Sequence, residues 1–125
     1  MAIFINTTLT KDGLTIPAGS IIKPNTHFPA DEWVQDELGE FTGEFIRKVS
    51  MDLIHYTSKA DFQAFKNSIG ECDQLPSHFI KVLDTDDYAA LAGPNAFLTV
   101  ETWLKDYLND LLGAGICSII DPYAI

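Results

Sequence analysis

The sequence has few basic residues and no long hydrophobic run. Only 8 of its 125 residues are Lys or Arg, against 18 Asp or Glu, so the net charge is −10. Such a surface repels a phosphate backbone and anionic lipid, so we expect no direct nucleic-acid binding and no membrane docking. No apolar run approaches the roughly 20 residues that span a bilayer, and the first residues lack the basic region of a signal peptide. These features predict a chain of cytoplasmic origin.

Cysteine is also scarce. The two cysteines, Cys72 and Cys117, lie far apart in the sequence and do not make a disulfide framework. In a reducing compartment we expect both to be buried thiols.

Recognisable motifs for catalysis, metal binding and nucleotide binding are missing. None of His27, His55 and His78 is paired with another His or Cys at metal-ligand spacing. The acids at 84–87 lack the Gly and Glu positions of a calcium-binding loop, and helix capping explains them better. No phosphate loop, dinucleotide fingerprint or nucleophile elbow is present. We therefore expect no enzyme activity, no cofactor and no metal.

What the sequence does contain is enough apolar material for one core. Hydrophobic residues make up 46% of the chain, which is an ordinary globular composition. A chain of this length predicts a single domain over residues 1–125.

Strand and helix signals are interspersed along the chain. Runs rich in β-branched and aromatic residues predict strands, and a capping residue followed by apolar positions at helical spacing predicts a helix. The predicted strands are residues 2–9, 14–16, 20–23, 44–56, 79–83 and 116–120. The predicted helices are residues 58–69, a short one that begins at Asp84, and residues 99–112. The order predicts an α+β domain, in which a small, mostly antiparallel sheet carries two short helices and one longer C-terminal amphipathic helix packed on it.

Capping residues support the three helices. Ser58 precedes the first helix, and Asp84 with Asp87 resembles a capping box at the second. Thr99 is the predicted N-cap of the third helix, and Gly113 is its predicted end. Its apolar stripe follows helical spacing through Val100, Trp103, Leu104, Tyr107, Leu108 and Leu111.

Residues 25–43 are the least regular part and predict an irregular acidic loop, with a short helix from Asp31 as a possibility. Its acids are Asp31, Glu32, Asp36, Glu37 and Glu40. Trp33 lies among them, and a large aromatic in such a segment is either an interface anchor or a cover for the domain's own core. The N-terminal strand is apolar on both faces and is predicted to be an edge that accepts another chain. The candidate interface residues are Ile3, Ile5, Ile21, Trp33, Asp36 and Glu37.

Two segments resemble a known group of proteins. The run Gly-Leu-Thr-Ile-Pro-Ala-Gly-Ser-Ile-Ile-Lys at 13–23 is similar to the opening strands of small virion proteins of tailed bacteriophages. The run Val-Ser-Met-Asp-Leu-Ile-His-Tyr-Thr-Ser-Lys-Ala-Asp-Phe at 49–62 resembles a strand followed by a capped helix in such proteins. The resemblance covers about half the chain, contains no diagnostic motif and transfers no site residue.

The resemblance implies a neck, tail or baseplate subunit, present in several copies in the virion and made in the host bacterial cytoplasm. Its partners would be other virion proteins and copies of itself. A second hypothesis remains open, in which the chain is an acidic adaptor or inhibitor that presents carboxylates to a basic partner.

Overall fold

The fold is α+β, as the sequence predicts. The structure is a computed structural model that describes residues 1–124, without the side chains of residues 28–32. Five strands form one sheet in the order β6-β5-β4-β1-β7, and every neighbouring pair is antiparallel. They are β1 (Ala2–Ile5), β4 (Ser20–Gln35), β5 (Phe41–Tyr56), β6 (His78–Val82) and β7 (Cys117–Ile120). A separate hairpin consists of β2 (Leu9–Lys11) and β3 (Leu14–Ile16), and the helices are α1 (Lys59–Gln63), α2 (Thr85–Leu91) and α3 (Ala96–Leu112).

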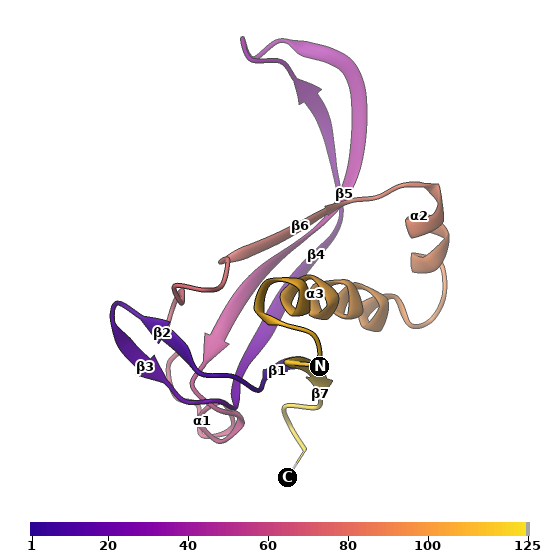
Figure 1. Cartoon of the computed structure of the whole chain (residues 1–125). Coiled ribbons are helices and arrows are strands. Elements are labelled where there is room, and N and C mark those ends of the chain that lie inside the picture. Colours follow the sequence, from indigo (N-terminus) through magenta and orange to yellow (C-terminus); the bar gives the residue numbers. More distant parts are fainter. Residues whose placement is uncertain (125) are drawn as a thin grey trace.

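Helix α3 lies across one face of the sheet (Figure 1). Val100, Leu104 and Leu108 are fully buried against a core to which β1, β4, β5 and β7 contribute. The predicted stripe is therefore correct at its centre, whereas Tyr107 and Leu111 are exposed. The helix begins earlier than predicted, because Asn95 and not Thr99 precedes its first turn. Gly113 ends it with a φ of 129°, a backbone angle that favours glycine.

Strand β1 is an interior strand, so the prediction of an exposed N-terminal edge is wrong. Ile3 pairs with Ile22 of β4 on one side and with Ile119 of β7 on the other. The reason is that the last strand returns to pair with the first, which no local pattern in the sequence indicates. Three of the candidate interface residues, Ile3, Ile5 and Ile21, have no exposed surface and belong to the interior.

The predicted irregular loop at 25–43 is the second error. Strand β4 continues to Gln35 and β5 begins at Phe41, so most of this segment forms one long hairpin. The short helix from Asp31 is absent, because the backbone there is a strand. Pro29 lies where the β4–β5 register shifts, between His27 and Ala30, and proline inside a strand is tolerated at such a bulge. Pairing with β5 thus overrides the low strand propensity of the segment.

The caps of the short helices are confirmed. The Ser58 hydroxyl accepts a hydrogen bond from the Asp61 N–H at 3.0 Å. The carboxylates of Asp84 and Asp87 each accept from the other residue's backbone N–H, at 2.8 and 3.1 Å, which completes a capping box.

The helix predicted from Ser58 to Ile69 is too long. Helix α1 ends at Gln63, and Phe65 adopts a φ of 58°, outside the helical region. The Ile69 N–H instead donates to the His55 carbonyl at 2.9 Å, so Ile69 reaches the core from a loop. Among residues 1–124, no helix combines the length and the apolar character needed to cross a bilayer.

Truncating Leu104 to alanine is expected to lower the free energy of unfolding by about 2–5 kcal/mol, because Leu104 is fully buried and its removal leaves a cavity. Urea denaturation measures the change. The matched control is Leu111→Ala on the exposed side of the same helix, which should cost less than about 1 kcal/mol. Equal losses in the two variants would contradict this assignment of the buried face.

Candidate functional site: the hairpin arm and the groove at its base

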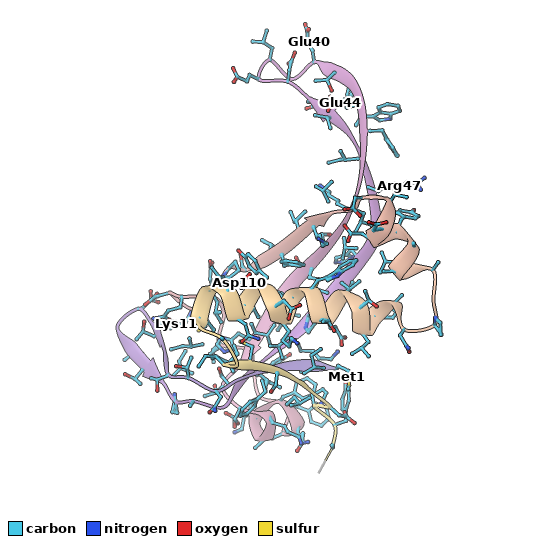
Figure 2. All side chains as sticks on the ribbon, turned by 45° about the vertical axis from the view of Figure 1, so that its right-hand side comes forward. Met1, Lys11, Glu40, Glu44, Arg47 and Asp110 are labelled. Atoms are coloured by element: carbon cyan, nitrogen blue, oxygen red, sulfur yellow. The ribbon has the colours of Figure 1, made fainter. Side chains whose placement is uncertain are left out.

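The outer half of the β4–β5 hairpin projects from the body as an arm (Figure 1). We define the arm as residues 31–47. Strand β6 pairs with β5 only from Lys48 to Asp52, and β1 pairs with β4 only from Ser20 to Ile22. Beyond those points the two strands pair only with each other among the described residues. Figure 2 places Glu40 and Glu44 toward the end of the arm and Arg47 at its base.

The turn at the end of the arm is organised by Asp36. Its backbone N–H donates to the Glu40 carbonyl at 2.8 Å, and its carbonyl accepts from the Gly39 N–H at 3.0 Å. One carboxylate oxygen also accepts from the N–H groups of Leu38 and Glu40, at 2.9 and 3.0 Å. Gly39 has a φ of 80°, which a tight turn takes most easily with glycine. Asp36 therefore holds the turn in shape, a role that the sequence pattern did not distinguish from interface contact.

Large apolar side chains are exposed along the arm. Trp33 is 56% exposed, Phe41 68% and Leu38 86%, and Phe45 is also exposed. The rings of Trp33 and Phe45 lie opposite each other on paired residues, with centroids 5.0 Å apart. Trp33 therefore contacts the arm and does not cover the core of the domain. A two-stranded hairpin has no interior in which to bury such groups, so they remain exposed to solvent.

Arg47 connects the arm to the body. Its guanidinium donates to the Tyr88 hydroxyl at 2.7 Å and lies 5.0 Å from the centre of the Tyr88 ring. It also lies 5.9 Å from the centre of the Phe45 ring. These contacts tie the base of the arm to helix α2 by a charge-assisted hydrogen bond and cation–π attraction.

A groove lies where the arm, the end of β6 and the start of α2 meet. Its volume is about 510 Å³. The lining residues are Phe45, Ile46, Arg47, Val82, Leu83, Asp84, Thr85 and Tyr88. The groove is mainly apolar, with one cation, Arg47, and one carboxylate, Asp84, so it continues the exposed apolar surface of the arm onto the body.

The end of the arm is anionic. Asp36, Glu37 and Glu40 in the turn are all exposed, as is Glu44 on β5. Of the predicted interface residues, Trp33, Asp36 and Glu37 therefore lie on the arm, although Asp36 also serves its turn. The side chains of Asp31 and Glu32 lie outside the described residues. The arm thus combines apolar rings with carboxylates, a pairing that the acidic stretch around Trp33 already indicated.

Two histidines meet an aspartate on the sheet face opposite α3, which sequence spacing did not predict. The Asp52 carboxylate lies 2.8 Å from His78 Nδ1 and 3.5 Å from His27 Nε2. Each ring contacts a different oxygen, so the carboxylate stands between the two rings. Across the described part of the chain, no group of three or more His, Cys, Asp or Glu is placed to hold a metal ion.

The remaining histidine meets a cysteine in the interior. Cys72 Sγ lies 2.9 Å from His55 Nδ1, and both side chains are buried. Burial raises the pKa of the Cys72 thiol, and burial together with the Lys11 charge lowers the pKa of His55 to about 4. A nucleophilic cysteine needs the opposite shifts, toward thiolate and imidazolium. This pair is therefore a neutral hydrogen bond that supports the fold. Burial also raises the pKa of the other cysteine, Cys117, to about 11.

The free energy of unfolding should fall as the pH drops from about 6.5 toward 4. The pKa of His55 is about 4 in the fold against 6.5 unperturbed, so the unfolded chain binds a proton that the folded chain does not. The stabilisation is complete above pH 6.5, and its loss approaches roughly 3 kcal/mol at the acid end. Urea titrations at several pH values measure it.

The test variant is His55→Gln, which removes the buried imidazole, and its reference is the parent chain. The acid slope should become shallower in the variant. An unchanged slope in His55→Gln would refute the assignment.

Comparison with known proteins provides no related arm from which a function could be inferred. No known protein family, no curated protein and no solved structure matches this chain. The function must therefore be argued from the residues themselves.

Proposed function

We propose that this protein is a structural subunit that joins neighbouring chains through its hairpin arm. The observation that carries the proposal is the exposure of Trp33, Leu38 and Phe41 on an element that projects away from the core. Apolar surface on that scale is costly in water unless a partner covers it. A projecting arm also reaches beyond its own chain, because each extended residue adds about 3.3 Å.

The particle we propose is that of a tailed bacteriophage, with the chain in the neck, the tail or the baseplate. The similarity of residues 13–23 and 49–62 to small virion proteins supports this choice. The Cys72–His55 pair is compatible with this role, because both side chains are buried and their pKa shifts oppose formation of a thiolate. The partners proposed are copies of the same chain and other virion proteins, and the proposed location is the virion.

The groove at the base of the arm supports assembly among copies. It lies beside Arg47 and Tyr88, at the opposite end of the arm from the Asp36 turn. A contact between different surfaces of identical chains is heterologous, and repetition of such a contact produces closed rings or helical tubes. Necks and tails require arrangements of this kind.

The double variant Leu38→Ser, Phe41→Ser is expected to abolish assembly through the arm, leaving at most a dimer, while the body stays folded. Both side chains are exposed, so the loss of apolar area affects the contact and not the core. Sedimentation velocity over a range of protein concentrations measures assembly, and circular dichroism confirms folding. Electron microscopy of purified particles, with the chain located by a tag, tests its place in a virion.

The matched control is the double variant Leu14→Ser, Phe65→Ser, which removes comparable exposed groups away from the arm. It should assemble as the parent does. A parent chain that stays monomeric at every concentration and occurs in no particle would refute the proposal.

The acidic end of the arm supports a second candidate, an adaptor or inhibitor that binds a basic partner. This candidate predicts that Glu37→Lys with Glu40→Lys abolishes binding and that salt weakens the complex. Assembly through apolar contacts predicts instead that complexes persist in high salt and tolerate these reversals. Sedimentation of both variants at low and high ionic strength separates the two candidates.

A further inference from the structure

Strand β6 is an edge of the sheet, and two hydrogen bonds fix the direction of its backbone groups. The Leu53 N–H donates to the Ser77 carbonyl at 2.9 Å, and the Leu83 N–H donates to the Arg47 carbonyl at 2.8 Å. In an antiparallel ladder such bonded pairs alternate. The backbone groups of Phe79 and Lys81 therefore point toward β5, and those of His78, Ile80 and Val82 point away from the sheet.

These outward groups have no partner within the described part of the chain. The register of β6 on β5 is regular from His78 to Val82, with no bulge and no proline. Lys81 does not shield the edge, because its ammonium lies 5.2 Å from the centre of the Trp103 ring and 3.7 Å from an Asp87 oxygen. A regular edge of this kind is a template for another strand.

The opposite edge of the sheet is protected at its start. In β7 the outward groups of Cys117 are both occupied by Asn109 of α3. The Cys117 N–H donates to the Asn109 side chain at 2.7 Å, and the Cys117 carbonyl accepts from it at 3.2 Å. The chain thus closes the start of one edge and leaves the other edge unpaired.

Charge and exposure on β6 also favour contact with a like surface. The three residues whose backbone groups point away from the sheet are Ile80, which is 57% exposed, Val82, which is 55% exposed, and His78, which is also exposed. None of the three is acidic, although the net charge of the chain is −10 and the Asp52 carboxylate lies 2.8 Å from His78. Two copies repel each other over most of their surface, so a contact between copies costs less through residues that are not themselves acidic.

We propose that β6 pairs with β6 of a second copy, antiparallel and about a two-fold axis at Ile80. In this register Ile80 faces the other copy's Ile80, and His78 faces the other copy's Val82. All outward backbone groups of the three residues are then satisfied on both chains, because each outward residue meets an outward residue. The two five-stranded sheets become one continuous sheet. This contact does not involve the arm and does not depend on the proposed function.

The Ile80→Cys variant tests the axis directly. Residues at a bonded antiparallel pair have Cα atoms about 5.5 Å apart, within the range that a disulfide bridges. Val82→Cys is the matched control, because it is equally exposed but lies about 13 Å from its own counterpart in this register. With mild diamide oxidation, Ile80→Cys should run mostly as a covalent dimer on a non-reducing gel. Val82→Cys should stay at the level of the parent, whose own cysteines are buried.

Charge at the axis gives an independent measurement. In the Leu38→Ser, Phe41→Ser background, where the arm contact is absent, Ile80→Lys and Ile80→Glu each place like charges opposite each other. Each variant alone should then shift from dimer to monomer in sedimentation. An equimolar mixture of the two should recover the dimer, because opposite charges then meet. Circular dichroism identifies any variant that fails to fold.

Three results would each overturn the pairing. The first is a monomeric parent in which Ile80→Cys forms no disulfide, and the second is equal crosslinking of Ile80→Cys and Val82→Cys. The third is that Ile80→Lys and Ile80→Glu each stay dimeric when measured alone. The Leu38→Ser, Phe41→Ser arm variant should retain the Ile80→Cys crosslink. Failure of the edge contact is thereby distinguished from failure of the arm.

Discussion

The ladder between β4 and β5 is the interaction on which the rest of the molecule depends. Its inner half places Ile22 and Met51 in the core beneath α3, and its outer half stands in solvent. One set of backbone hydrogen bonds therefore supports both the body and the arm. The body gives the arm a fixed base, because Arg47 is held against Tyr88 of α2.

One face of β5 changes character along its length. Met51 and Val49 are buried under α3, Arg47 on the same face meets α2, and Phe45 is exposed on the arm. The exposed aromatic surface is thus the continuation of the core-facing side of the sheet after the covering helices end. In the sequence, Phe45, Arg47, Val49 and Met51 occupy alternate positions, and Arg47 is the one charged residue among them.

Local signals in the sequence predicted the local structure. The caps at Ser58 and Asp84, the stripe around Leu104 and the stop at Gly113 all depend on residues within a few positions of each other. The strand from Ala2 to Ile5 was recognisable too, but its position between β4 and β7 depends on a segment more than a hundred residues away. Such pairing leaves no local trace, so Ile3, Ile5 and Ile21 were assigned to an interface and are buried.

The sequence did not predict the hairpin arm for a different reason. Proline, glycine and many acids lower strand propensity, and only pairing with residues 41–47 compensates for this. Trp33 and Glu37 were nevertheless identified as candidate contacts, since an aromatic among acids is unusual wherever the backbone places it. The meeting of Cys72 with His55, and of Asp52 with His27 and His78, could not be read from spacing, because each joins separate elements.

The bulge at Pro29 determines which side of the arm carries the tryptophan. Between His27 and Ala30 strand β4 advances by one residue more than β5 does, and this extra residue brings Trp33 opposite Phe45. Side chains alternate along a strand, so losing or gaining a single residue here would move Trp33 to the other side of the arm. Insertions or deletions in this segment would keep Trp33 on the same face as Phe45 only if they changed the length by an even number of residues. The spacing between body and arm, more than the identity of any one residue in it, therefore determines that Trp33 and Phe45 share one face.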